Sequence, residues 1–297
     1  MCTGTARTPH PTSTTETVVD STTHRISFPS DPEVWLPKIF SEQGYATVGL
    51  HTHRYLHRSV SNIYRAFDEY YYPVDRFVGG QKFLSEGRHW TDYMYLDTLY
   101  PACDEWLEAN YEREFLMYVH VIDVHGPYNR VRILEEDRQS VEKGLEDGSI
   151  AFSKIPGTDL YALGDADKKY LYDGHIRYVD EYLQKLVGKL AELGVRDDTY
   201  VIFTSDHGED FGEHGGQWGH GHSVYNTQIR IPLVVLLHRD LAAARRRIRG
   251  HVNTVGLLAT LAELAGIELP PRMGCRSFAR LLRSSSEPHA RPARQGR

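Results

Sequence analysis

Residues 199–222 read TYVIFTSDHGEDFGEHGGQWGHGH and join a strand pattern to a dense group of polar side chains. The first six residues, 199–204, form an unbroken apolar strand pattern of the kind found inside parallel sheets. Four histidines and four carboxylates follow at once, interspersed with glycines. Because ligands in open α/β sheets bind beyond the carboxyl ends of the strands, this run predicts a ligand site.

The adjacent pair Asp206 and His207 is the part of this stretch that suits a metal ion. A carboxylate is a hard oxygen donor and an imidazole is a nitrogen donor, and together they favour a divalent cation. The neighbouring glycines would let the backbone fold closely around such an ion. We therefore treat these two residues as candidate metal ligands.

Outward from this stretch, strands and helices alternate along the chain. Gly44 is predicted to end a helix over 30–43, and Gly194 is predicted to end a long helix over 167–193. Ser30 and Glu33 have the spacing of a capping box at the start of the first helix. Strands are predicted over 46–50, 115–123, 199–204 and 231–237, and helices over 30–43, 102–112, 167–193 and 252–265. This order predicts an α/β fold with a mainly parallel sheet flanked by helices.

We expect one domain over residues 1–283, followed by a disordered Ser-, Pro- and Arg-rich tail over 284–297. The aromatic and polar segment 60–100 is predicted to be an excursion over the sheet. Residues 130–165 are charged and contain glycine, which predicts a mobile surface insertion.

Composition argues against several classes of function. The chain has 297 residues, a formal net charge of −6 and a pI of about 6.2, so it lacks the broad positive charge that holds nucleic acid. Its one basic run, at Arg245, Arg246, Arg247 and Arg249, reads as a solvated helix face.

No window approaches the roughly 20 consecutive apolar residues of a membrane span, and the first residues lack a signal-peptide core. We therefore expect a cytoplasmic protein that binds neither nucleic acid nor membrane. Cys2, Cys103 and Cys275 are too few and too widely spaced to indicate a disulfide framework or a thiolate metal site. The oligomeric state is left open.

A second candidate site residue follows the predicted strand 115–123. His125 lies in the segment Asp123–Tyr128, directly beyond the end of that strand. Two strands that end in metal-type and acid–base-type residues strengthen the prediction of a single catalytic edge.

The motifs now described resemble those of the sulfatase family in the alkaline phosphatase superfamily. The stretch TSDHGEDFGEHGGQWGHGHSVYNTQIRIPLVV is similar to the family's C-terminal signature, and FLMYVHVIDVHGPY is similar to its strand that ends in a His-containing segment. The similarity covers about residues 30 to 280. It implies an alkaline-phosphatase-like α/β fold.

The resemblance also implies roles for single residues. Asp206 and His207 correspond to metal ligands, and His220 corresponds to a residue that contacts the sulfate and the leaving-group oxygen. His125 corresponds to a second sulfate-contacting histidine that can act as the general acid. His214 would lie behind the site, and His51, His53 or Arg54 would supply a further basic contact.

Two features depart from the family pattern. Family members carry an acidic pair on an N-terminal strand that completes the metal site, and this chain shows none ahead of its Thr- and Pro-rich segment, so we expect a truncated start or a lost site.

Cys2–Ala6 does not match the family's Cys/Ser-x-Pro-x-Arg nucleophile pattern. The nucleophile is therefore assigned to Thr8, with Thr12 and Ser13 as alternatives. A hydroxyl of this kind needs metal coordination to become reactive.

The sequence therefore predicts a metal-dependent hydrolase of sulfate esters, with Ca²⁺, Mn²⁺ or Mg²⁺ as cofactor and a small-molecule sulfate or phosphate ester as substrate. One alternative is a phosphate mono- or diester hydrolase or a phosphotransferase of the same superfamily. Another is a catalytically silent, truncated relative.

Overall fold

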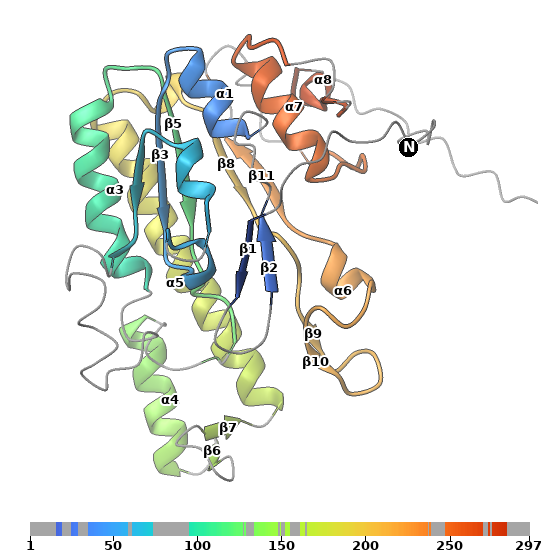
Figure 1. Ribbon diagram of the computed structural model, residues 1–297. Coiled ribbons are helices and arrows are strands. Elements are labelled where there is room, and N and C mark those ends of the chain that lie inside the picture. Colours follow the sequence, from blue (N-terminus) through green and yellow to red (C-terminus); the bar gives the residue numbers. More distant parts are fainter. Residues whose placement is uncertain are drawn as a thin grey trace, which may run out of the picture. The chain divides into compact units, whose positions relative to one another are not determined.

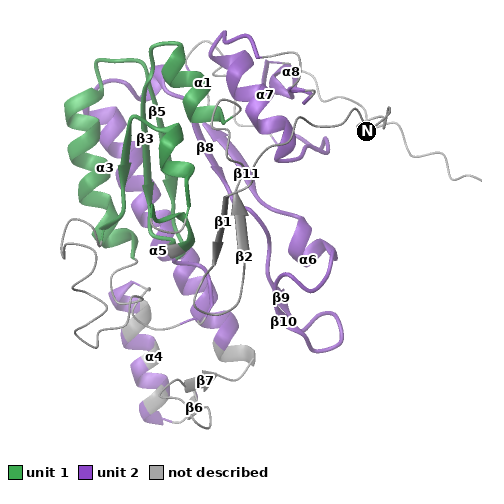
Figure 2. Ribbon diagram, viewed as in Figure 1, with its two compact units in different colours: residues 1–122 green, residues 123–297 purple. Residues whose placement is uncertain are grey.

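The structure is a computed structural model in which the chain forms two compact units, residues 1–122 and 123–297 (Figures 1 and 2). It describes residues 16–19, 25–28, 35–58, 61–73, 95–126, 128, 134–147, 149, 152–154, 161–163, 165–236, 238, 247–269, 273 and 275–283. The predicted single domain over 1–283 stays a prediction, and the predicted tail over 284–297 lies outside the described residues.

The first unit is built on a parallel sheet with the strand order β4-β3-β5. The central strand β3 (Ala46–His51) is buried along its whole length, as its apolar sequence predicts. The helices α1 (Leu36–Glu42) and α3 (Leu96–Asn110) contact β3. The neighbouring strands are β4 (Glu69–Tyr71) and β5 (Phe115–His120), and the unit also contains the strands β1 (Glu16–Val19) and β2 (Arg25–Phe28) and the short 3-10 helices η2 (Arg54–Leu56) and η3 (Ile63–Ala66).

The helix boundaries in this unit follow their local signals in part. Gly44 follows the C-cap residue Gln43 of α1 and has a φ of +93°, which confirms the predicted stop because glycine adopts this conformation without strain. α1 begins at Leu36 after an extended N-cap residue, Trp35, so the predicted helix start at Ser30 was wrong; Ser30 and Glu33 themselves lie outside the described residues. α3 begins at Leu96, earlier than the predicted 102, because Pro101 is accommodated inside the helix.

The second unit contains the longest helix, α5 (Asp165–Glu192). Its buried face carries Leu171, His175, Tyr178 and Val179, which recur at helical spacing. Gly194, with a φ of +77°, follows its end as predicted. The predicted mobile insertion over 130–165 instead contains α4 (Glu135–Asp147) and an antiparallel pair of short strands, β6 (Phe152–Lys154) and β7 (Tyr161–Leu163). Polar surface helices lack the apolar pattern by which a sequence reveals a helix.

The strand that precedes the candidate site is β8 (Val201–Thr204), and it pairs with β11 (Leu233–Leu236). This pair is antiparallel, so the expectation that β8 lies in a parallel sheet was wrong for the partner that the structure describes. An apolar run shows that a strand is buried but does not show the direction of its neighbour. The mainly parallel α/β class itself is confirmed, with the parallel sheet in the first unit.

The chain between β8 and β11 forms a long loop that we call the histidine loop, residues 205–232. It contains the two-residue strands β9 (Asp210–Phe211) and β10 (Trp218–Gly219) and the short helix α6 (Asn226–Ile229) (Figure 1). The helices α7 (Val255–Leu264) and α8 (Ala279–Arg283) complete the unit. None of the described helices combines the length and the apolar composition needed to span a membrane.

Candidate active site

Asp206 and His207 lie directly beyond the end of β8, as predicted. The Asp206 Oδ1 atom accepts a hydrogen bond from the His207 backbone N–H at 2.9 Å, and it lies 3.7 Å from His207 Nε2. His207 Nδ1 is 2.8 Å from the Gly208 carbonyl oxygen. Because a carbonyl oxygen only accepts, Nδ1 carries the proton and the lone pair of Nε2 stays available.

Gly208 fixes this pair against α6. Its backbone N–H donates to the Gln228 carbonyl oxygen at 2.7 Å. A Cβ atom added at Gly208 would lie 2.1 Å from the Thr227 carbonyl oxygen, which no side chain can tolerate. The glycine is therefore required for this close approach of two backbone segments.

The side chain of Gln228 contacts two further residues of the histidine loop, Gly221 and His222. Its side chain is buried, with only 4% exposed. The Oε1 atom accepts from the Gly221 backbone N–H at 3.0 Å, and Nε2 lies 3.0 Å from His222 Nε2. A single side chain thus links α6 to the segment that carries His220.

His220 is held by a buried carboxylate. Its Nδ1 lies 3.1 Å from Glu209 Oε1, and the side chain of Glu209 is 8% exposed. The other carboxylate oxygen, Oε2, accepts from the Tyr128 hydroxyl at 2.8 Å. Glu209 and Tyr128 were not among the predicted site residues, although both stand inside the quoted motifs.

The second unit brings three of the predicted histidines together. The ring centroids of His207 and His220 are 3.9 Å apart, and those of His125 and His220 are 5.0 Å apart. His125 Nδ1 makes a short contact with the Gly126 carbonyl oxygen. Each of the three imidazoles therefore has its Nδ1 on an acceptor and keeps Nε2 for other partners.

The other predicted residues lie elsewhere or are not described. His214 stacks on Tyr225 with a centroid distance of 3.7 Å and an interplanar angle of 18°. Thr8, Thr12 and Ser13 lie outside the described residues, so the predicted nucleophile stays a prediction.

The candidates for a further basic contact belong to the first unit. His51 is 1% exposed, its Nδ1 is 3.0 Å from the His53 carbonyl oxygen, and its ring stacks on Tyr72. Burial lowers the pKa of His51 to about 3, so this side chain is uncharged at neutral pH. The side chain of Arg54 lies outside the described residues.

The donor chemistry of Asp206 and His207 fits a divalent cation, since a carboxylate oxygen and a free imidazole nitrogen lie side by side. The contact of His207 Nδ1 with a carbonyl oxygen is typical of metal-binding histidines. Within the described part of the chain, no group of three or more His, Cys, Asp or Glu residues is arranged to hold a metal ion. These residues alone would hold a cation weakly, because affinity follows the number and charge of the ligands.

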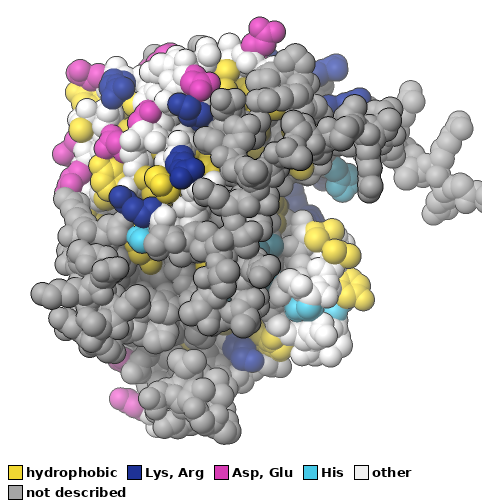
Figure 3. All heavy atoms as spheres, in the orientation of Figure 1, with side chains coloured by type: hydrophobic (Ala, Val, Ile, Leu, Met, Phe, Trp, Pro, Cys, Tyr) yellow, Lys and Arg dark blue, Asp and Glu magenta, His cyan; other side chains and the backbone are white. Residues whose placement is uncertain are grey.

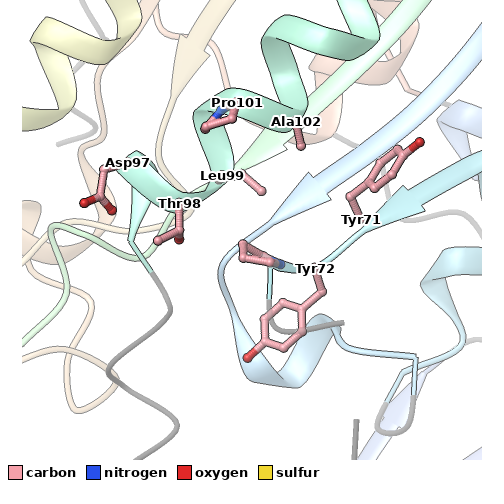
Figure 4. A pocket seen from close by; sticks show the side chains of 8 residues that line it. Tyr71, Tyr72, Asp97, Thr98, Leu99, Pro101 and Ala102 are labelled. Atoms are coloured by element: carbon pink, nitrogen blue, oxygen red, sulfur yellow. The ribbon is translucent and has the colours of Figure 1, made fainter. Parts of the chain in front are cut away.

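Two hollows lie outside this histidine cluster. In the first unit, a cavity of about 230 Å³ is bounded by the end of β4, the two residues after it and the first turns of α3, and Asp97 is the one acidic side chain among its described lining residues (Figure 4). In the second unit, an open groove of about 550 Å³ runs beside His214 and Tyr225. Two residues that line this groove, Val224 and Tyr225, have exposed hydrophobic side chains, and Ile229, four residues further along the chain, is exposed as well. Figure 3 shows hydrophobic and histidine side chains gathered on the right of the view, where Figure 1 draws α6.

Comparison with known proteins identifies the family of these motifs. The family model described as Sulfatase matches residues 1–267. Arylsulfatase K of Xenopus laevis is 32% identical over 114 residues, which are 38% of this chain and 20% of that protein. The chain thus matches about a fifth of the length of this relative.

Solved structures share the fold at low sequence identity. The lipoteichoic acid synthase of Listeria monocytogenes matches with a TM-score of 0.54 and 18% identity, over 82% of this chain and 54% of that chain. The phosphonate monoester hydrolase of Agrobacterium radiobacter matches with a TM-score of 0.54 and 17% identity, over 86% and 62% of the two chains.

Proposed function

Since the chain belongs to the sulfatase family, we propose that it is an ester hydrolase that acts on sulfate esters of small molecules. One observation carries the proposal: three imidazoles, His125, His207 and His220, lie together beside Asp206, and each keeps its Nε2 atom for another partner. A tetrahedral anion is recognised by groups that converge in this way.

Asp206 and His207 would hold a divalent cation, with Ca²⁺, Mn²⁺ and Mg²⁺ as the candidates. Bound there, a cation would neutralise negative charge on an ester's oxygen atoms and lower the pKa of a coordinated hydroxyl group. The two residues contribute one oxygen and one nitrogen donor, 3.7 Å apart, to this site.

His125 and His220 would act on the transferring group. As imidazolium ions they would donate from Nε2 to oxygen atoms of the ester, and one of them would protonate the leaving oxygen. Contacts of this kind typically contribute about 10² to 10⁴ in rate. Thr8 would supply the attacking hydroxyl, with Thr12 and Ser13 as alternatives.

A second candidate function is the hydrolysis of phosphate or phosphonate esters. Sulfate and phosphate groups are both tetrahedral anions, and a phosphonate monoester hydrolase is among the proteins of the same fold. A third candidate is a catalytically silent relative, which is favoured by the lack of a third metal donor among the described residues.

Assays of the purified full chain with an aryl sulfate, an aryl phosphate and an aryl phosphodiester would test the proposal. Each ester is assayed with added Ca²⁺, Mn²⁺ or Mg²⁺, and again after treatment with a chelator. We expect the aryl sulfate to be hydrolysed fastest and the rate to fall on chelation. Preferential hydrolysis of either phosphorus ester supports the second candidate, and hydrolysis of none of the three contradicts the proposal.

Calorimetric titration of the metal separates the enzyme from the silent relative. Asp206→Asn should weaken metal binding by at least about tenfold, because it removes the charged donor. Asp180→Asn is the matched control, since Asp180 lies on α5 and accepts a hydrogen bond from Gln184 at 2.8 Å. Equal metal affinity in the two variants would contradict the assignment of Asp206.

A further inference from the structure

We propose that Glu209 and Tyr128 are positioning residues that hold the His220 imidazole in one tautomer and one orientation. The inference rests on the proposed function only for the role of His220. The contacts themselves are independent of that role: Glu209 Oε1 meets His220 Nδ1 at 3.1 Å, and Glu209 Oε2 accepts from the Tyr128 hydroxyl at 2.8 Å.

The tautomer follows from the chemistry of the partner. An ionised carboxylate accepts hydrogen bonds and donates none, so the nitrogen facing it must carry the proton. His220 is therefore protonated at Nδ1, and Nε2 is the nitrogen that can give or take a proton at the ester. When the imidazolium releases its Nε2 proton to a leaving oxygen, the neutral ring that remains is the Nδ1–H form that Glu209 binds.

Burial makes Glu209 an effective anchor. Its side chain is 8% exposed, so water competes little for the two carboxylate oxygens. A carboxylate is rarely buried to this extent without hydrogen-bond partners, and Tyr128 and His220 supply one for each oxygen.

Tyr128 in turn is fixed by aromatic neighbours. Its ring lies against Tyr172, His175 and Phe211 at centroid distances of 5.5, 5.9 and 6.1 Å. Burial, together with the nearby Glu209 carboxylate, raises the pKa of the Tyr128 hydroxyl, which therefore remains a donor. Because Tyr172 and His175 belong to α5, the longest of the described helices supports the orientation of His220 through the side chains of Tyr128 and Glu209.

Glu209→Gln provides a sharp test of the tautomer. The Tyr128 hydroxyl would still donate to the side-chain oxygen, which leaves the amide NH₂ facing His220 Nδ1. That nitrogen must then accept, so the ring proton moves to Nε2. Nitrogen-15 NMR of the imidazole rings, with His220 assigned from the spectrum of His220→Asn, should show Nδ1–H in the wild type and Nε2–H in Glu209→Gln.

Kinetics should separate positioning from mere structural support. We expect Glu209→Gln to lower kcat by about 10- to 100-fold, the range for removal of a partner that orients a functional histidine, with little change in KM. Tyr128→Phe keeps the ring packing and loses one hydrogen bond, so we expect a loss of about fivefold in kcat. Glu213→Gln is the matched control on the same loop, since Glu213 Oε2 accepts from the Phe211 backbone N–H at 2.6 Å.

The inference is overturned if the wild-type His220 carries its proton on Nε2 or if Glu209→Gln leaves the tautomer unchanged. A fall in kcat that is no greater in Glu209→Gln than in Glu213→Gln would also overturn it. If Glu209→Gln does not fold, Tyr128→Phe decides the question through kinetics. Glu209 still faces His220 Nδ1 in this variant, so the Nδ1–H tautomer should persist, and a kcat equal to that of the wild type refutes the pair. Failure of the wild type to hydrolyse any ester would contradict the proposed function and leave the NMR test valid.

Discussion

Replacement of the buried His51 should flatten the dependence of stability on pH. The pKa of His51 falls from 6.5 to about 3 on folding, mainly through burial and also through the charges of His120, His57 and His53. Below pH 6.5 the unfolded chain takes up a proton that the folded chain refuses, so the free energy of unfolding falls as the pH drops from 6.5 toward 3. Between pH 7 and pH 5 this loss is about 2 kcal/mol.

The structure explains why protonation is resisted. His51 Nδ1 already donates to the His53 carbonyl oxygen, and in the described part of the chain His51 Nε2 has no hydrogen-bond partner. His51→Asn keeps a donor near the position of Nδ1 but cannot titrate in this range. Urea denaturation at pH 7 and pH 5, followed by far-UV circular dichroism, should show a pH-dependent loss smaller by about 2 kcal/mol in this variant than in the wild type.

The control is His251→Asn, at an exposed histidine before α7, which tests whether any histidine substitution flattens the profile. The reasoning is refuted if His51→Asn loses as much stability as the wild type between the two pH values, within about 0.5 kcal/mol. It is also refuted if both variants flatten the profile equally.

Three further substitutions test the packing. Gly208→Ala should reduce kcat/KM and metal affinity by at least about tenfold, because its Cβ would meet the Thr227 carbonyl oxygen at 2.1 Å; wild-type values in both assays would contradict the close approach. Gly188→Ala should stabilise the chain by about 0.5–1 kcal/mol in urea denaturation, since Gly188 lies inside α5 with open space around its Cβ position, and a loss would show strain there. Leu107→Ala should cost about 2–5 kcal/mol in the same assay, because Leu107 is fully buried on α3; a cost under 1 kcal/mol would contradict that burial.

Local signals in the sequence predicted the elements that position the site. The apolar run before Asp206 predicted β8. The helix stops at Gly44 and Gly194 were also confirmed, because the positive φ that ends a helix depends on the type of a single residue and can therefore be predicted from the sequence. The resemblance to the sulfatase family, carried by the same short motifs, was confirmed by the match over residues 1–267.

Contacts between distant positions were not accessible in the same way. Tyr128 and Glu209 are separated by 81 residues, and nothing in either motif shows that a hydroxyl of one meets a carboxylate of the other. The direction of β11 beside β8 was missed for a related reason, because the return path of the 205–232 loop sets it and the composition of the strand does not.

The hydrogen bonds that Gln228 accepts from the histidine loop determine how this loop can open. The backbone N–H groups of Gly208 and Gly221 both donate to this one buried residue. Gly208 donates to its carbonyl oxygen and Gly221 to its Oε1 atom. If Gln228 leaves its place, both amides are released in the same event. The segment from β8 to α6 should therefore open as a single cooperative unit, and hydrogen exchange at these two glycines should proceed at matched rates.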